Sequence, residues 1–233
     1  MIISHRHRFI FIKNRKTAST SIEVALSGIC GEEDVIIPLD QEDEKYRQSL
    51  GYRGSQNHAI PIQYYRWSDF IKLLKYRTRV TYYNHMNAKQ IRDRVPSSVW
   101  DSYFKFCFER NPFDKIISWF YWRQDYLKKR FSSVADFIRS GDANMLSGFP
   151  MYSIDGRVAV DKIYKYEEMD SALNDLTERF SLQKPLLLPN KRLKGQLRED
   201  RRHYSEVLNS EDIELVKAKF SREFDIMGYE LSE

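Results

Sequence analysis

Residues 8–27 read RFIFIKNRKTASTSIEVALS. Residues 8–13 form a short apolar run bounded by charged residues, which is typical of a buried β-strand. Residues 20–27 place apolar side chains largely on one side of a helix, and Gly28 can end that helix. We therefore expect a strand, a loop of basic and small hydroxyl residues, and a helix in direct succession.

The same order of elements recurs further along the chain. Residues 103–109 (YFKFCFE) alternate aromatic residues with smaller or charged ones, as in a strand, and Asn111-Pro112 begins a helix. Residues 162–166 predict a third strand, again followed by a helix. Strands that alternate with helices favour a parallel sheet covered on both faces. We therefore expect an α/β fold over residues 1–233, a single domain with a central parallel β-sheet flanked by helices.

Other elements are predicted by shorter patterns. Further helices are expected at residues 67–76, 87–94 and 210–220, and a short strand is expected at residues 35–38. The charged residues 41–48 form either a loop or a helix.

The composition excludes several classes of protein. The 233 residues include 38 Lys and Arg against 33 Asp and Glu, and 42% are hydrophobic, which excludes a disordered or low-complexity chain. Cys30 and Cys107 have no Cys or His at ligand spacing, which excludes a disulfide scaffold and a zinc module and suits a reducing compartment. The apolar run 9–12 is too short for a signal peptide or a membrane span. We expect a cytoplasmic protein without stable membrane insertion.

The loop between the first strand and its helix has features of an anion site. A helix N-terminus, cations and several hydroxyl donors follow one another there. The loop runs from Lys13 to Ser21, and its candidate binding residues are Arg15, Lys16, Thr17, Ala18, Ser19, Thr20 and Ser21. The alternative is that Ser19 or Thr20 only caps the helix. The loop lacks the glycines and the Gly-Lys-Ser/Thr order of a Walker A motif, so an ordinary ATP or GTP loop fits poorly.

The second strand-to-helix turn repeats this arrangement. Arg110 follows the strand directly, and Ser118 lies within the helix, where its hydroxyl could share one ligand with Arg110. The alternative is that Arg110 pairs with Asp114 and that Ser118 is a neutral helix residue.

Together, these two motifs resemble the phosphosulfate-binding loop and the 3′-phosphate motif (Arg-Asn-Pro-x-Asp-[Arg/Lys]-x-x-Ser-x-x-Tyr) of the carbohydrate-type sulfotransferases. Those enzymes use 3′-phosphoadenosine 5′-phosphosulfate (PAPS). The resemblance is strong over residues 8–27 and 82–122 and weaker over 164–173 and 224–229. One departure is Glu109, where family members usually carry an apolar residue. The resemblance implies the P-loop nucleotide-kinase-like fold of sulfotransferases.

The resemblance also implies roles for individual residues. Lys16 would contact the 5′-phosphate and the bridging oxygen to sulfur, the loop around it would cradle that phosphate, and Arg110 with Ser118 would hold the 3′-phosphate. A basic segment falls where relatives close a loop over the nucleotide, although a solvated charged helix explains it equally well. Its residues are Lys191, Arg192, Lys194 and Gly195. No metal is expected, because the donor is already activated.

The acceptor hydroxyl needs a base and a binding surface. A histidine lies at about the position of His85 in related sulfotransferases, so His85 is the first candidate, with His58 and the carboxylate of Glu23 as alternatives. Residues 52–83 mix flat rings with cations, which suits sugars and their anionic groups. His58, Arg66 and Tyr83 are the expected acceptor contacts.

We therefore expect a PAPS-dependent sulfotransferase that acts on a hydroxyl of a glycan or glycolipid. Two alternatives stay open: a P-loop-like kinase that uses ATP and magnesium, and a non-catalytic nucleotide-binding or nucleic-acid-binding protein. A formal net charge of +5 is modest for a nucleic-acid partner, so none is expected. The acceptor and the oligomeric state are left open by the sequence.

Overall fold

The computed structural model describes residues 1–190 and 204–229 and contains a five-stranded sheet. The strand order is β3-β1-β2-β4-β7. The strands are β1 (Ile2–Ser4), β2 (Phe9–Phe11), β3 (Val35–Ile36), β4 (Phe104–Glu109) and β7 (Lys162–Lys165). Each strand expected from the sequence is present within this sheet, and the α/β class is confirmed.

The expectation of a wholly parallel sheet is wrong, because the sheet is mixed. Strands β2, β4 and β7 are parallel to one another, whereas β1 runs antiparallel to both β2 and β3. Only residues 5–8 connect β1 to β2, and so short a connection permits a hairpin but no crossover. The three-residue strand β1 was not predicted from the sequence.

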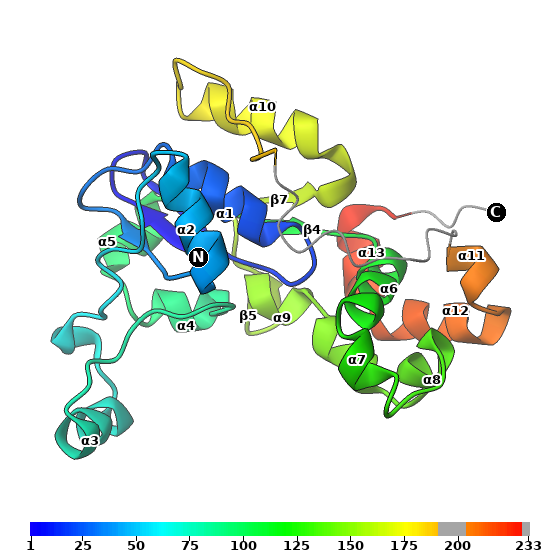
Figure 1. The fold of residues 1–233 in the computed structure, drawn as a ribbon. Coiled ribbons are helices and arrows are strands. Elements are labelled where there is room, and N and C mark those ends of the chain that lie inside the picture. The colour runs from blue at the N-terminus through cyan, green and yellow to red at the C-terminus, as the bar shows by residue number, and fades with distance from the viewer. Residues whose placement is uncertain (191–203, 230–233) are drawn as a thin grey trace.

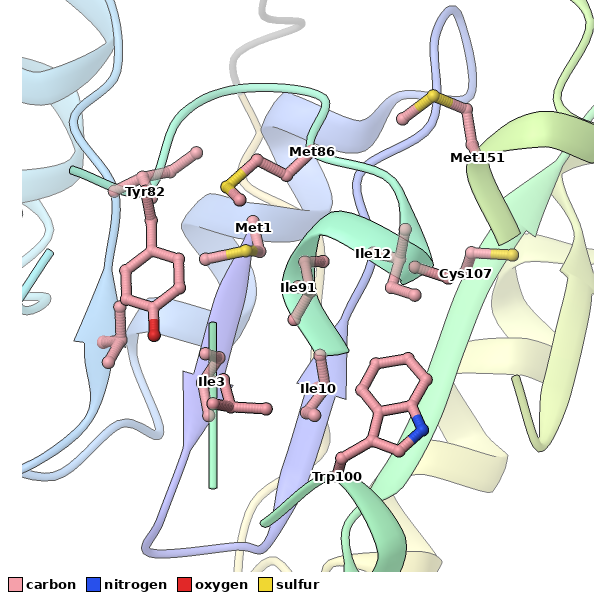
Figure 2. Packing of buried hydrophobic residues seen from close by; sticks show 14 of the residues in the cluster. Met1, Ile3, Ile10, Ile12, Tyr82, Met86, Ile91, Trp100, Cys107 and Met151 are labelled. Carbon is pink, nitrogen blue, oxygen red and sulfur yellow. The ribbon is translucent and has the colours of Figure 1, made fainter. Parts of the chain in front are cut away.

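Helices cover both faces of the sheet. Ile10 of β2 and Ile12 just after it belong to one buried cluster (Figure 2), whereas Phe9 and Phe11 belong to another, because neighbouring side chains of an extended chain point to opposite faces. The first cluster includes residues of α4 (Ala88–Arg92), α5 (Ser97–Ser102) and α9 (Phe149–Tyr152). The second includes residues of α1 (Ser19–Ser27) and α10 (Met169–Arg179). Figure 1 shows α4 and α10 on opposite sides of the strands.

A third buried cluster holds a group of helices beside the sheet (Figure 1). These helices are α6 (Pro112–Trp122), α7 (Gln124–Leu127), α8 (Val134–Arg139), α11 (Tyr204–Val207), α12 (Ser210–Lys219) and α13 (Ser221–Met227). Apolar residues of α6, such as Phe113, Ile116 and Phe120, pack into this cluster. Helix α6 therefore connects the end of β4 to a helical layer.

The remaining elements are short or lie toward the periphery. They are α2 (Gln41–Ser49), η1 (Ile62–Tyr64), α3 (Trp67–Tyr76), η2 (Asp142–Leu146), β5 (Ser153–Ile154), β6 (Arg157–Val158) and η3 (Tyr166–Glu168). The helix expected at residues 67–76 is confirmed as α3, and residues 41–48 are helical. No helix in the described part of the chain is long and apolar enough to cross a membrane.

The order of the parallel strands determines where a site can form. Strand β2 pairs with β4 and β4 pairs with β7, so their carboxyl ends lie at one edge of the sheet. Ligands of α/β proteins bind at such an edge, in the crevice beyond the carboxyl ends of neighbouring strands. The turns that follow Phe11, Glu109 and Lys165 therefore meet there.

Candidate functional site

A cavity of about 540 Å³ lies among the turns at the carboxyl ends of β2, β4 and β7. Most of the residues predicted from the sequence to bind nucleotide or to act in catalysis line it together. They are Arg15, Lys16, Ala18, Ser19, Thr20, His85, Arg110 and Ser118. Two separate sequence motifs thus contribute to one cavity.

Other predicted residues lie elsewhere. Thr17 and Ser21 belong to the same loop and the start of α1, but both are buried and neither lines the cavity. The Thr17 hydroxyl donates to the Asn14 carbonyl at 3.5 Å. The predicted residues Lys191, Arg192, Lys194 and Gly195 lie outside the described residues.

The structure does not bring the predicted acceptor contacts to the cavity. Arg66 donates to Asp93 at 2.6 Å at the start of α3, and Tyr83 is an exposed side chain. His58 is half-buried and does not line the cavity either. His58, Arg66 and Tyr83 therefore do not line the cavity together with Lys16, and their role as acceptor contacts stays a prediction.

The loop after β2 has an unusual backbone. Lys16 and Ala18 both adopt positive φ angles, 58° and 53°, although neither is glycine. Strained residues of this kind gather at ligand-binding loops, where alternating backbone conformations turn N–H groups toward an anion. The loop achieves without glycine a conformation for which glycine is the usual residue.

The start of helix α1 is not capped by a side chain. Its N-cap residue is Ala18, which has no side-chain oxygen, so the alternative in which Ser19 or Thr20 merely caps the helix is wrong. The first N–H groups of a helix have no intrahelical acceptor. Because Ala18, Ser19 and Thr20 line the cavity, this helix end supplies the cavity with positive potential.

Arg110 and helix α6 form the opposite wall. The Arg110 guanidinium lies 4.4 Å from the ring centroid of Tyr166, and its Nε is buried without a hydrogen-bond partner among the described residues. The ammonium of Lys16 lies 4.7 Å from the ring of Trp122, in the same helix as Ser118. Helix α6 therefore faces both motifs.

The carboxylate of Glu109, the residue that departs from the sulfotransferase pattern, is fully buried. It accepts from the Lys115 ammonium at 2.5 Å, from Nδ2 of Asn14 at 3.0 Å and from the backbone N–H of Arg110 at 2.8 Å. A buried carboxylate requires such partners. No described contact joins it to the Arg110 guanidinium, which instead lies over Tyr166.

Asn14 connects the two motifs directly. Besides Glu109, its Nδ2 donates to the Phe108 carbonyl at 3.2 Å, and its Oδ1 accepts from the Arg15 N–H at 2.8 Å. The loop after β2 is thereby hydrogen-bonded to the end of β4. This link was not predicted, because it joins residues that are distant in the sequence.

His85 is oriented by the backbone of the first loop. Its Nδ1 lies 3.0 Å from the Lys13 carbonyl oxygen, which can only accept, so Nδ1 carries the proton and Nε2 is the acceptor of the neutral ring. Burial, with further contributions from Lys13 and Arg15, lowers the pKa of His85 to about 4. His85 is therefore neutral at pH 7, with the lone pair of Nε2 not used by the bond to Lys13.

Glu23, the other alternative base, has a structural role. Its carboxylate is fully buried, 2.6 Å from the Lys13 ammonium and 2.9 Å from the Met1 ammonium. Despite the cost of burial, these two cations hold the pKa of Glu23 below its usual range. Because it does not line the cavity, Glu23 is not placed to deprotonate an acceptor there.

Several lining residues were missed by sequence analysis. They are Asp40, Asn84, Trp119, Trp122, Arg123 and Tyr166, whereas Lys13, which also lines the cavity, belongs to the predicted loop. The helical spacing could have indicated Trp122, because it lies one turn after Ser118. The Arg123 guanidinium lies 4.3 Å from the Trp122 ring.

The charge of the cavity is strongly positive. Asp40 is the single carboxylate among the described residues that line it. The cations that line it are Lys13, Arg15 and Lys16 of the loop after β2 (the Lys16 loop), Arg110 and Arg123. Within residues 1–190 and 204–229, no group of three or more His, Cys, Asp or Glu side chains could hold a metal ion. The arrangement suits a multiply charged anion with a flat ring, beside a neutral histidine.

Comparison with known proteins identifies one relative. A protein from Archaeoglobus fulgidus described as uncharacterized is 32% identical to this chain over 104 residues, which cover 43% of this chain and 87% of the archaeal protein. No family model matches the chain, and no solved structure is significantly similar to it. With that identity over most of the archaeal protein, the chain belongs to the same family as the uncharacterized A. fulgidus protein.

Proposed function

We propose that this protein is a sulfotransferase that moves a sulfuryl group from PAPS to a hydroxyl of a carbohydrate or glycolipid. The observation that carries the proposal is the shared cavity. The Lys16 loop and the Arg110–Ser118 turn line it together, as a ligand with phosphate groups at two ends would require. The buried and unpartnered Nε of Arg110 fits such an anion.

The residues of the loop would bind the 5′ end of the nucleotide. PAPS, when bound, supplies a sulfuryl group already activated by its link to phosphate. The uncapped start of α1 would donate backbone N–H groups to the 5′-phosphate, as helix N-termini do for other phosphates. The Lys16 ammonium would stabilise the negative charge that develops on the departing oxygen.

Arg110, Ser118 and His85 would perform the remaining tasks. Arg110 and Ser118 would hold the 3′-phosphate, the group that distinguishes PAPS from ATP and ADP. Nε2 of His85 would take the proton from the acceptor hydroxyl while the new oxygen–sulfur bond forms and the bond from sulfur to the phosphate oxygen breaks. The hydrogen bond from Nδ1 to Lys13 would keep the ring in the tautomer that this step needs.

Isothermal titration and a transfer assay test the proposal. The protein should bind the product 3′-phosphoadenosine 5′-phosphate (PAP) more tightly than ADP. It should also transfer the labelled sulfuryl group of sulfur-labelled PAPS to glycans or glycolipids from the organism that produces the protein. Lys16→Asn is the matched variant, because Asn tolerates the left-handed backbone at this position but carries no charge. The rate of sulfuryl transfer by this variant should be lower than that of the wild type by roughly a hundredfold or more.

The kinase alternative is tested with the same protein. Asp40 lies in the cavity and could take part in binding magnesium with ATP. Tighter binding of ATP with magnesium than of PAP, together with phosphate transfer, would replace the sulfotransferase proposal with a kinase. Binding of oligonucleotides with a steep salt dependence and no response to PAPS would indicate a nucleic-acid-binding protein.

A further inference from the structure

Helix α3 exposes a continuous apolar face. Trp67, Ile71 and Leu74 follow one another at helical spacing and are 80%, 50% and 82% exposed, with Phe70 beside them at 37%. Figure 1 shows α3 projecting from the rest of the molecule. A contiguous exposed apolar patch on a helix marks an interaction surface, whereas scattered exposed residues do not.

The orientation of this face is held by the opposite side of the helix. Asp69 is buried, lies 2.5 Å from Nη1 of Arg94 and accepts from the backbone N–H of Arg66 at 2.8 Å. The rings of Tyr65 and Phe70 pack edge to face, with their centroids 5.6 Å apart. Helix α3 is therefore attached by a buried ion pair that directs its apolar face outward.

The charges around the apolar face have one sign. Lys72, Lys75, Arg77 and Arg79 are all exposed. The single acidic residue between positions 66 and 79 is Asp69, and its charge is neutralised by Arg94. The surface of this segment thus combines large apolar side chains, one of them a tryptophan, with an excess of positive charge.

We propose that α3 docks this protein on a membrane surface that contains anionic lipids. Amphipathic helices with Trp and Leu on one face and Lys and Arg beside it lie in the headgroup region, where anionic lipids attract the cations. Ten residues extend over about 15 Å, half the hydrocarbon thickness of about 30 Å, so α3 lies on a bilayer without spanning it.

A second copy of the chain is a less suitable occupant. A symmetric contact between two α3 faces would bring the same cations of both copies together, and like charges at an interface oppose association. The docking surface shares no residue with the lining of the cavity. Membrane binding therefore succeeds or fails independently of the sulfotransferase proposal.

Co-sedimentation of the full chain with vesicles tests the docking surface. Phosphatidylcholine vesicles that contain phosphatidylserine should bind the protein, whereas phosphatidylcholine alone should bind it weakly, and added salt should weaken the binding. Trp67→Ser with Leu74→Ser should lower the affinity about tenfold or more, because both side chains leave the apolar phase. Lys72→Glu with Lys75→Glu should lower it by about fivefold or more for each charge.

Matched controls lie elsewhere on the surface. Tyr126→Ser with Leu187→Ser removes two exposed apolar residues, and Lys128→Glu with Lys129→Glu reverses two exposed charges outside α3. Both controls should bind vesicles like the wild type, and circular dichroism should show all four double variants folded.

Three results would overturn the proposal. The first is no binding to vesicles of either composition, and the second is equal loss of binding in the controls. The third is a dimer that dissociates when Trp67 and Leu74 are replaced, without vesicle binding, which would assign the face to self-association.

Discussion

His85 is the residue on which the proposed chemistry depends. It lies in the cavity with a left-handed backbone, φ 61°, and its Nδ1 donates to a main-chain carbonyl of the Lys16 loop. A bulky side chain adopts such a backbone only where the surroundings enforce it. The ring is therefore positioned by the same loop that would bind the phosphate.

Replacement of His85 should separate chemistry from nucleotide binding. In His85→Asn, the side chain tolerates the left-handed backbone but cannot take up a proton near neutral pH. We expect the rate of transfer to fall about a hundredfold to ten-thousandfold, while the affinity for PAP measured by titration calorimetry stays close to that of the wild type. Wild-type turnover in this variant would remove His85 from the mechanism.

The protonation of His85 gives a second test at this scale. Burial and nearby cations disfavour the imidazolium, so the ring should remain neutral down to about pH 4 in the unliganded protein. Its NMR signals, assigned by their loss in His85→Asn, should titrate near that value and shift to a higher pKa when PAP adds negative charge. A pKa near 6.5 for His85 in the unliganded protein would contradict the buried position of its ring.

The same pKa also affects stability. Because the unfolded chain takes up a proton at this residue near its ordinary pKa of about 6.5, the unfolded state binds more protons between that pH and about 4. The contribution of His85 therefore destabilises the fold as the pH falls through this range.

At the scale of elements, the ends of β2 and β4 are joined by a buried polar cluster. Glu109 accepts from Lys115, Asn14 and the Arg110 N–H, and Asn14 in turn holds the backbone of Arg15. These bonds fix the two turns that line the cavity. Gly148 packs against the cluster so closely that a Cβ at this position would lie 1.8 Å from Oε2 of Glu109.

Removal of the Glu109 charge alone should lower the stability of the fold more than removal of the Glu109 and Lys115 charges together. Glu109→Ala leaves the Lys115 ammonium buried without its partner, and we expect a loss of about 3–5 kcal/mol in the free energy of unfolding, measured with urea. Glu109→Gln combined with Lys115→Met removes both charges and should retain most of the stability. Equal losses in the two proteins would show that the ion pair does not dominate this cluster.

At the scale of the whole molecule, local sequence patterns predicted more than long-range pairings did. The strands β2, β4 and β7 and the helices α1, α3 and α6 were predicted because each carries its own periodicity or end signal. The antiparallel strand β1 was missed, since its three residues show no period and its direction follows from a four-residue connection.

The candidate site was predicted to a similar extent. Lys16, Arg110 and Ser118 belong to local motifs, His85 was chosen from the family resemblance, and the structure brings all four to one cavity. The link between Asn14 and Glu109 depends on the pairing of β2 with β4, which a single sequence does not reveal. The acceptor contacts expected at residues 58–83 do not line the cavity, and composition alone does not show in which direction a segment extends.

Binding of the whole ligand should stabilise the whole protein. PAP at about 100 times its dissociation constant should stabilise the fold by about 2.7 kcal/mol, which raises the Tm of a chain of this size by about 5–10 °C. ADP should give a smaller rise at the same concentration, and magnesium should add nothing to the effect of PAP. A larger rise with ATP and magnesium would favour the kinase alternative.

In the proposed function, two turns of one sheet hold opposite ends of a nucleotide with two phosphates. The most direct test is the ratio of the affinities for PAP and 5′-AMP, measured by calorimetry in the wild type, Arg110→Ala and Lys16→Asn. The wild type should prefer PAP by about tenfold to a hundredfold, the gain expected from a charge-assisted bond to the 3′-phosphate. Arg110→Ala should reduce this preference to near unity and leave the affinity for AMP unchanged. Lys16→Asn should lower the affinities for PAP and AMP by the same factor. Equal affinity of the wild type for PAP and AMP, or equal weakening of both ligands by Arg110→Ala, would contradict the claim.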